Sequence, residues 1–418
     1  MDGREQRGLE IAARFKVVRR DSGWSVPSQS GVGRYTVSGL DADAPRCTCP
    51  DFETRGEPCK HIYAVRVVIQ REFTFDGETV TETETVSVTK TVKRTYPQNW
   101  PAYNAAQTHE KDRFMVLLRD LCAGLPEPDQ KRGRPRLPIR DAVFTAVMKV
   151  YTTASARRSM SDLREAHKRG HISKLPCHNS VLNALENPDF APVLLSLITE
   201  SSRPLKAVEV DFAVDSSGFT TCRFESWFDH KYGAPRRQHS WIKAHIMCGV
   251  KTNVVTAIEI HGPNTNDGTQ LPALVNTTAK TFPIGEVSAD KGYGTVINAD
   301  TIAGHGGTPF IAFKSTHTGQ GGHSRPRGSG AWGKMFGYFL YRREEFVAHY
   351  HKRSNVESTF SMIKRKFGDS LRSKTETAQV NETLAKVLCH NLVVLIHEMY
   401  ELGIDPVFWA SAERTTAC

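Results

Sequence analysis

Hydrophobic and polar residues alternate in several short runs in the second half of the chain, and this alternation predicts β-strands. The first run, residues 208–219 (VEVDFAVDSSGF), ends in turn-forming residues. Two further strands follow at 241–250 and 254–262, joined by a turn at Thr252 and Asn253. Beyond them, the spacing predicts a helix at 269–280, a strand at 286–294, a helix at 295–304, a strand at 308–314 and a long helical region through residue 367.

This order of elements, βββαβαβα, predicts an α/β domain built on a mixed sheet. The first three strands form an antiparallel meander, and the later strands need crossover helices, which make parallel pairs. A ribonuclease H-like sheet is the natural interpretation of this order.

The first half of the chain has a different pattern. Residues 14–39 predict short strands separated by Gly and Ser turns, and residues 62–69 predict a helix. Helical spacing returns at 110–125, and three short helices are predicted at 139–151, 160–167 and 180–185. Arginine and lysine residues on or between these three helices fit a helix-turn-helix that reads DNA, or a plain helical bundle, and the sequence leaves both open.

Composition and charge narrow the class of protein. The 418 residues, with 39% hydrophobic and 24% charged residues, are typical of a globular protein of two to four domains. The net charge of +10 suits a polyanionic partner such as nucleic acid. No apolar run is long enough for a membrane span and the start lacks a signal peptide, so we expect a protein of the cytoplasm, associated with the nucleoid and not with a membrane.

A cluster of metal-ligating residues lies near the start of the chain. It has the pattern C-T-C, nine residues, then C-K-H, and its members are Cys47, Cys49, Cys59 and His61. Three thiolates and an imidazole fill a tetrahedral zinc shell, so the ion is expected to be structural. The spacing resembles that of the SWIM zinc finger, a module linked to nucleic-acid or protein binding.

These patterns predict four segments. They are a SWIM-like zinc-finger domain at 1–75, a linker at 76–101, a helical region that is a candidate for DNA binding at 102–206, and the ribonuclease H-like domain at 207–410. The linker is assigned from its alternation of Thr, Val and Glu. A basic strip inside the helical region, KRGRPRLP, is either a solvated linker or a contact to a narrow minor groove, made by Arg132, Arg134 and Arg136.

Three acidic residues lie where separate elements of the predicted sheet converge. Asp215 lies at the expected end of the first strand, Asp290 at the end of the fourth, and Glu357 on the last helix. Carboxylates left partly open suit Mg²⁺ or Mn²⁺ and a phosphate that bridges two ions. We therefore expect a site for in-line attack on a phosphodiester.

The helix around Glu357 has a polar stripe beside an apolar one. Tyr350, Arg353, Glu357 and Lys364 fall within an arc of about 60° at 3.6 residues per turn. The neighbouring apolar stripe, which we expect to anchor the helix on the sheet, consists of Val356, Phe360, Ile363 and Phe367. Lys352 is expected on the face that points to solvent.

The strings VDSSGF, ADKGYG and Y-x2-R-x3-E-x6-K resemble those of the DDE transposases of prokaryotic insertion sequences, in the subgroup with the tyrosine, arginine, glutamate and lysine motif. The resemblance implies catalytic metal ligands at Asp215, Asp290 and Glu357, with two Mg²⁺ or Mn²⁺ ions, and DNA contacts at Tyr350, Arg353 and Lys364. It implies a transposase that cleaves transposon ends and joins the 3′ hydroxyl to target DNA. Because two ends are joined in one event, a homodimer on DNA is expected.

Two other acids compete for a place in the site. Asp211 lies on the same strand face as Asp215, and we favour Asp215 because catalytic acids tend to lie at strand ends. Asp267 precedes a predicted helix and is expected to cap it.

Other classes of function share part of this pattern. A DNA-binding regulator or host-adopted transposase relic would keep the fold without strand transfer, although all three acids remain in place here. A metal-dependent nuclease would share the triad and would cleave without joining.

Overall fold

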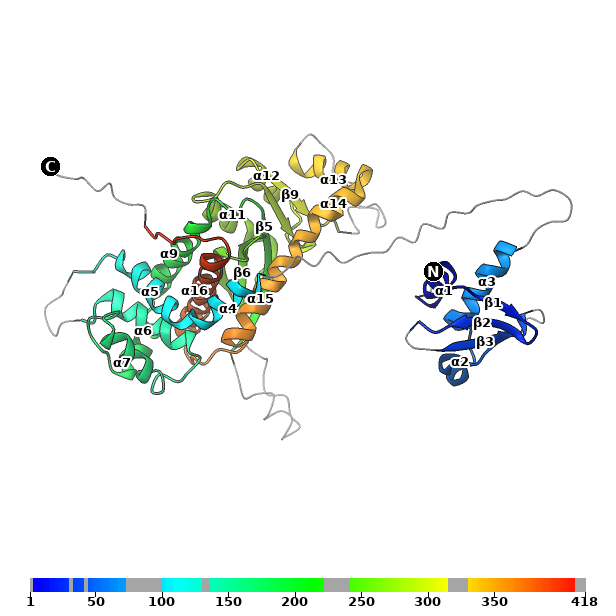
Figure 1. The fold of residues 1–418 in the computed structure, drawn as a ribbon. Helices are drawn as coiled ribbons and strands as arrows, with labels where there is room; N and C mark the ends of the chain where they lie inside the picture. Colours follow the sequence, from blue (N-terminus) through cyan, green and yellow to red (C-terminus); the bar gives the residue numbers. More distant parts are fainter. Residues whose placement is uncertain are drawn as a thin grey trace, which may run out of the picture. The chain divides into compact units, whose positions relative to one another are not determined.

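The computed structural model describes residues 3–29, 33–40, 44–72, 99–129, 136–221, 241–314 and 330–409. The chain divides into two compact units, Met1–Tyr96 and Pro97–Cys418 (Figure 1). Arg132 and Arg134 lie outside the described residues, as does most of the segment expected to be a linker. None of the described helices is both long enough and apolar enough to cross a membrane.

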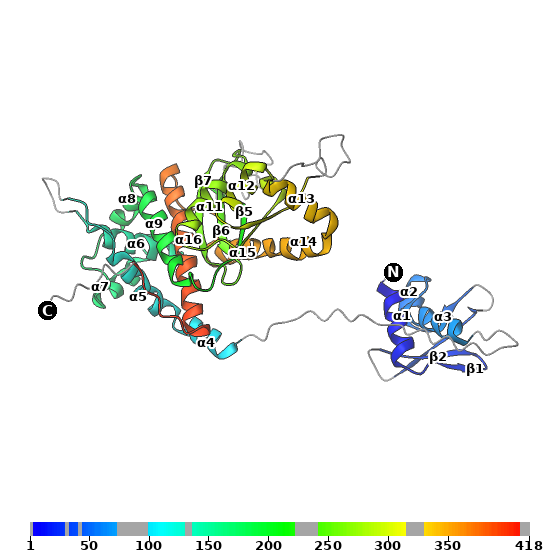
Figure 2. The same ribbon diagram turned by 90° about the horizontal axis from the view of Figure 1, so that it is seen from above.

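The first unit packs helices against a small antiparallel sheet (Figure 2). The sheet has the order β1-β2-β3-β4, with strands Val18–Arg20, Gly23–Pro27, Arg34–Ser38 and Arg46–Cys47. Helix α1 (Gly3–Arg14) lies along α3 (Lys60–Glu72), and α2 (Pro50–Arg55) is a short turn of helix between β4 and α3. A Cβ atom at Gly8 would lie 2.5 Å from the Cβ atom of Tyr63, so this close approach of α1 and α3 requires glycine.

The core of the first unit is small. Its buried side chains come from α1, the sheet and α3, and include Ile11, Val26, Val37, Ile62 and Val65. The strands and the helix after His61 were predicted from the sequence. Helix α1 was not predicted, because its sequence GREQRGLEIAAR is mostly polar and only Gly8 and Ile11 are buried.

The second unit begins with a layer of helices. These are α4 (Trp100–Thr108), α5 (Glu110–Ala123), α6 (Ile139–Tyr151), α7 (Met160–Lys168), α8 (His178–Glu186) and α9 (Phe190–Ser202). The sequence predicted α5, α6, α7 and α8 to within a few residues. It missed α4 and α9.

The sheet of the second unit has five strands in the order β7-β6-β5-β8-β9. Strands β5 (Phe212–Thr220), β6 (Trp241–Gly249) and β7 (Val255–His261) form the expected antiparallel meander. Strands β8 (Glu286–Ala289) and β9 (Thr308–Ile311) extend the sheet in parallel on the other side of β5. The sheet is therefore mixed, as the order of elements predicted.

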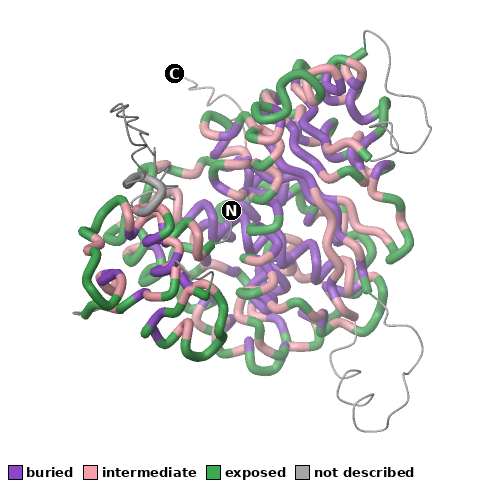
Figure 3. Tube along the Cα trace, turned by 90° about the vertical axis from the view of Figure 1, so that its right-hand side faces the viewer, coloured by how far each residue is buried: buried purple, intermediate pink, exposed green. Residues whose placement is uncertain are grey.

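Helices cover both faces of this sheet. One face packs on α11 (Leu271–Ala279) and α12 (Val296–Gly304), through a core that includes Phe212, Val214 and Met247. The other face packs on α15 (Ser354–Phe367) and α16 (Glu376–Glu401). Figure 3 shows the buried residues gathered along the sheet and the helices next to it.

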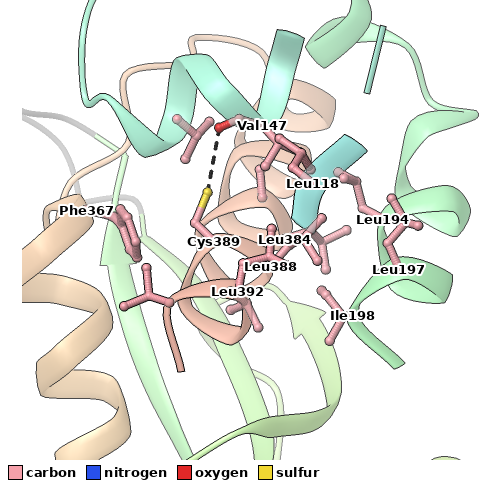
Figure 4. Close-up of a cluster of buried hydrophobic side chains, with 14 of the residues drawn as sticks. Leu118, Val147, Leu194, Leu197, Ile198, Phe367, Leu384, Leu388, Cys389 and Leu392 are labelled. Carbon is pink, nitrogen blue, oxygen red and sulfur yellow. Dashed lines mark hydrogen bonds between the residues drawn. The ribbon is translucent and has the colours of Figure 1, made fainter. Parts of the chain in front are cut away.

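Helix α16 joins the helical layer to the sheet. Its residues from Asn381 to Ile396 are all buried, and its neighbours include α4, α6, α9 and strand β7. In Figure 4, Leu384, Leu388 and Leu392 lie among side chains of the helical layer, such as Leu118 and Ile198. The helices before residue 206 and the sheet after it therefore share one hydrophobic core.

The segment expected as one long helix is divided. It consists of α13 (Ala331–Tyr341), α14 (Arg343–Tyr350), the 3₁₀ turn η5 (His351–Arg353) and α15. Phe310 of β9, Met335 of α13 and Phe346 of α14 form a separate core cluster that holds α13 and α14 on the edge of the sheet. As predicted, Val356, Phe360, Ile363 and Phe367 are buried and anchor α15.

Candidate active site

The register of two parallel strands brings Asp215 and Asp290 together. Strand β5 pairs with β8 through Val214 and Ala289, and the two aspartates are the next residue on each strand. Neighbouring strands lie about 4.8 Å apart, so the two residues are adjacent at the point where the parallel pairing ends. Asp215 was expected at the end of its strand, and this was wrong. The antiparallel pairing of β5 with β6 continues past it to Thr220.

One face of β5 meets the segment that contains Glu357. Side chains alternate along a strand, so Asp215, Ser217 and Phe219 lie on the same face. Arg353 Nη1 donates to Asp215 Oδ2 at 2.9 Å, and Lys364 Nζ donates to Ser217 Oγ at 2.7 Å. The Lys364 ammonium also lies 5.3 Å from the centre of the Phe219 ring.

Glu357 is linked to Asp215 through Arg353. Arg353 Nη2 donates to Glu357 Oε1 at 2.6 Å, one turn along the same segment. The side chains of Arg353 and Asp215 are 22% and 23% exposed, whereas that of Glu357 is 57% exposed. The Arg353 guanidinium therefore lies between the half-buried carboxylate of Asp215 and the exposed carboxylate of Glu357.

The acids at this edge repel one another. Burial raises the pKa of Asp215, and the carboxylates of Asp290 and Glu357 raise it further, while the Ser216 N–H and Arg353 oppose them. A cluster of carboxylates that disfavours its own ionisation gains free energy when a hard cation binds, since the cation offsets the repulsion. The residues present therefore fit divalent metal ions.

The three acids do not form a single tight shell. In the described parts of the chain, the Cys and His cluster of the first unit is the one group of at least three potential ligands whose atoms all lie within 4.8 Å of one another.

Tyr350 and Lys364 lie on either side of the acids along the same segment. Tyr350 is the last residue of α14, and burial raises the pKa of its phenol, which stays protonated at neutral pH. Burial lowers the pKa of Lys364, an effect that the Asp369 carboxylate opposes. Arg136, the described member of the basic strip, is exposed and lines a cavity between the start of α6 and α9, far along the sequence from the acids.

Asp211 forms an ion pair and a hydrogen bond away from Arg353 and Glu357. Lys352 Nζ lies 2.7 Å from Asp211 Oδ2 and 2.8 Å from Glu286 Oε2, and the Glu286 N–H donates to Asp211 Oδ1. The expectation that Lys352 points to solvent was wrong, because its ammonium neutralises these two acids beside the sheet. The contacts of Asp211 account for it without a catalytic role.

The expectation that Asp267 caps a helix was also wrong. Asn266 is the residue whose side chain caps the short 3₁₀ turn η3 (Asp267–Thr269), and it accepts from the Gly268 N–H at 3.0 Å. The Asp267 carboxylate instead lies against Ser216, Lys243 and His245. Its position on the opposite face of β5 from Arg353 was not foreseen, although the alternation that places Asp215 on one face places Ser216 on the other.

The zinc ligands of the first unit converge from a strand end and two helix starts. Cys47 is the last residue of β4, and Cys49 directly precedes α2. Cys59 directly precedes α3, and His61 is the second residue of α3. His61 Nδ1 lies 3.8 Å from Cys59 Sγ and 3.9 Å from Cys47 Sγ. All four residues are buried.

The cysteines of this cluster are unequal before metal binds. A hydrogen bond with Cys47, together with His61, lowers the pKa of Cys59 to about 3, although burial opposes the shift. Burial raises the pKa of Cys49. A buried set with one thiolate already formed suits Zn²⁺, whose binding releases the remaining protons.

Comparison with known proteins finds one family match in each unit. Residues 206–392 match the model of the transposase DDE domain, and residues 35–65 match the SWIM zinc finger. A cryo-EM structure of a piggyBac transposase synaptic complex with hairpin DNA is similar over 73% of this chain and 76% of that chain, with 12% identity and a TM-score of 0.34.

The two family matches enclose the residues singled out above. The SWIM match contains all four zinc ligands, and the DDE match contains Asp215, Asp290 and Glu357. The DDE match supports a divalent metal in the second unit and DNA as the partner. The chain combines a SWIM zinc finger that holds a Cys₃His zinc-binding cluster with a transposase DDE domain of ribonuclease H-like fold.

Proposed function

We propose that this protein is a transposase that cleaves DNA at transposon ends and transfers the freed 3′ hydroxyl to target DNA by two-metal-ion phosphoryl transfer. The observation that carries this proposal is that Asp215 and Asp290 follow paired residues of β5 and β8, while Arg353 bridges Asp215 to Glu357 of α15. Acids that lie 75 and 67 residues apart in sequence meet because the strand register and one ion-pair bridge bring them together.

The three carboxylates are the proposed ligands of two Mg²⁺ or Mn²⁺ ions. When bound, such ions supply Lewis-acid stabilisation of the phosphodiester and lower the pKa of the attacking water. The chain's own part is to hold anionic oxygens at fixed separations. Asp215 is fixed by its strand and by the Ser216 N–H, which donates to its Oδ1 at 2.8 Å.

The proposed DNA contacts are Tyr350, Arg353 and Lys364. Arg353 presents a planar fork that matches two phosphate oxygens, and Lys364 presents a point charge further along α15. Both cations contact side chains of β5. We infer that they exchange these contacts for backbone phosphates when a transposon end binds.

The helical layer is the proposed holder of the transposon end. On α7, Asp162 and Glu165 form ion pairs with Lys111. Arg164 and Lys168 lie on another side of the same helix, where both are exposed. No ion pair of Arg164 or Lys168 with another described residue is found. Unpaired cations on one helix face suit the phosphate backbone of a duplex, and the basic strip of Arg132, Arg134 and Arg136 belongs to the same proposal.

The direct test is a cleavage and strand-transfer assay on end-labelled DNA that carries the flanking sequences of the gene. We expect wild-type protein with Mg²⁺ to nick the element end and to join it to a target plasmid. Asp290→Asn and Glu357→Gln should abolish both steps and leave the fold intact, since each change is nearly isosteric. Asp300→Asn is the matched control, because Asp300 is an exposed acid of α12 in the same domain.

The assay also separates the other functions. Cleavage without joined product would make the protein a nuclease, and specific DNA binding without cleavage would make it a regulator or a relic. Undiminished nicking by Asp290→Asn or Glu357→Gln would overturn the assignment of the acids. Light scattering of the protein with and without end DNA tests the proposed homodimer.

A further inference from the structure

A buried polar cluster lies behind the proposed metal ligands, on the face of β5 that points away from α15. Its members come from four elements and are Ser216 of β5, Lys243 and His245 of β6, Asp267 of η3, and Tyr293 of the 3₁₀ turn η4 (Lys291–Tyr293). Ser216 and His245 are directly opposite each other in the β5–β6 register. The mechanism proposed above uses none of these side chains.

The side chains of this cluster contact one another closely. Ser216 Oγ donates to Asp267 Oδ1 at 3.2 Å, and Lys243 forms an ion pair with the same oxygen. His245 Nδ1 lies 3.1 Å from the Tyr293 hydroxyl and 3.6 Å from Asp267 Oδ1. The cluster therefore connects the middle of the sheet to both 3₁₀ turns.

Two members of the cluster, His245 and Tyr293, are shielded from solvent. His245 is 0% exposed and Tyr293 is 1% exposed, while Asp267 keeps about a third of its side chain open. Burial lowers the pKa of His245 to about 4, so its ring is neutral at neutral pH. A buried polar group that loses its partner costs free energy, so the contact between His245 Nδ1 and the Tyr293 hydroxyl is unfavourable to break. His245 Nε2 has no hydrogen-bond partner among the described residues.

Each end of the cluster is attached to a proposed metal ligand. Ser216 follows Asp215 directly, and its N–H donates to the Asp215 carboxylate. Tyr293 closes the turn that begins at Asp290, because the Tyr293 N–H donates to the Asp290 carbonyl at 2.9 Å. A displacement of either Ser216 or Tyr293 would thus move one of the two aspartates.

The two 3₁₀ turns are fastened to each other beside the cluster. Asn298 Nδ2 donates to the carbonyl of Gly268 in η3 at 2.8 Å and to the carbonyl of Tyr293 in η4 at 2.7 Å. A Cβ atom at Gly292 would lie 3.5 Å from Asp267 Oδ2, so the backbone of η4 lies directly against the carboxylate. Asp267 is therefore held on one side by β5 and β6 and on the other by the turn that carries Asp290.

We propose that Asp267, His245 and Tyr293 are positioning residues that fix the separation of Asp215 and Asp290, and thereby set the affinity of the site for divalent metal. This inference rests on the proposed function, because it takes the two aspartates as metal ligands. The cluster acts through the backbone next to each ligand and makes no contact with the ions or the DNA. In metal sites, changes to residues that orient the ligands typically lower affinity by about 10–100-fold.

The test measures Mn²⁺ binding to the zinc-loaded full-length protein without DNA, by electron paramagnetic resonance and calorimetry. Tyr293→Phe removes one hydroxyl and keeps the ring in the core, and Asp267→Asn removes the charge that Lys243 neutralises. We expect each change to weaken Mn²⁺ binding by about 10–100-fold. The matched control is Tyr338→Phe, whose hydroxyl contacts Glu345 on α14 and lies outside the cluster.

Separate arms distinguish the possible failures. Asp215→Asn should remove the strongest Mn²⁺ site from wild-type protein, and if it does not, the proposed metal site itself is wrong. If Asp215→Asn removes the site while Tyr293→Phe and Asp267→Asn stay folded and bind Mn²⁺ within twofold of wild type, the positioning proposal is overturned. Should Asp267→Asn fail to fold, Tyr293→Phe and Ser216→Ala decide the question, because both leave the charge pair in place.

Discussion

Arg353 Nη1 lies 2.9 Å from Asp215 Oδ2, so a proposed metal ligand is neutralised by a residue 138 positions further along the chain. The same guanidinium also holds Glu357. This one side chain therefore offsets part of the repulsion between the carboxylates. A divalent cation bound by the same acids would offset the same repulsion.

We predict that Arg353→Gln destabilises the metal-free protein and makes its stability depend more on Mg²⁺. The loss should be about 1–2 kcal/mol, a discounted figure for a pair that is about one-fifth exposed on each side. Thermal unfolding with and without 10 mM MgCl₂ is the measurement. The added Mg²⁺ should raise the Tm of Arg353→Gln by more than that of wild type, and an equal rise would contradict the counter-ion role. Arg342→Gln is the control, since its partner Glu345 is exposed.

The stability of the second unit should depend on pH through Lys386. This lysine is 1% exposed, and burial lowers its pKa to about 8 from an ordinary 10.5, against the opposing effect of Glu382. Between about pH 8 and pH 10.5 the unfolded chain binds this proton more strongly than the folded chain. The contribution of Lys386 to the free energy of unfolding therefore rises with pH across that window.

Denaturant unfolding of wild type and Lys386→Met at pH 7.5, 8.5 and 9.5 checks this dependence. Wild type should gain stability relative to the variant as the pH rises, because the other titrating groups are common to both proteins. The variant should be less stable throughout, since Lys386 Nζ also donates to the carbonyls of Gly368 and Ser370. A difference that stays constant across the three pH values would rule out the shifted lysine.

Loss of one zinc ligand should unfold the first unit alone. Cys59→Ser removes the thiolate that forms most readily, and the hydrophobic core of that unit is too small to fold without metal. We expect zinc content to fall from one ion per chain toward none, and protease to cut within about the first 70 residues while the DDE domain resists. Cys177→Ser, at an exposed cysteine, should leave both readouts unchanged. Equal zinc content in Cys59→Ser and wild type would refute the assignment.

The exposed cations of α7 should carry part of the affinity for transposon-end DNA. Replacing Arg164 and Lys168 by alanine should weaken binding to any duplex and lower the slope of log K against log salt by about two. Arg169→Ala is the matched control, because Arg169 is already paired with Asp112 and Glu165. An unchanged slope in the double variant would exclude this face of α7 from the DNA contact.

The order of strands and helices in the DDE domain could be predicted from the sequence, because its strands alternate cleanly and its turns contain Gly, Asn and Asp. Helices α9 and α16 were not predicted. The middle of α16 is buried on all sides, so its sequence lacks an amphipathic period. The 3₁₀ turn before Ser354 was not foreseen either, because helical spacing continues through it.

The residues of the candidate site stay a prediction, and their geometry could be foreseen only in part. The polar stripe was inferred from helical periodicity, although its members lie on α14, η5 and α15, and the structure places Arg353 and Lys364 against β5. The adjacency of Asp215 and Asp290 depends on a parallel register between strands 75 residues apart, which local pattern does not encode. Asp267 was misassigned because a sequence shows that a carboxylate precedes a helix, and not that its neighbour Asn266 takes the cap.

Helix α16 has one more consequence. Because both layers of the second unit pack on it, a chain that ends before Glu376 would leave the helices and the sheet without the buried helix that they share. Such a truncated chain should therefore not keep a folded DDE domain. The zinc finger, which has its own core and its own zinc-binding cluster, should fold independently of that truncation.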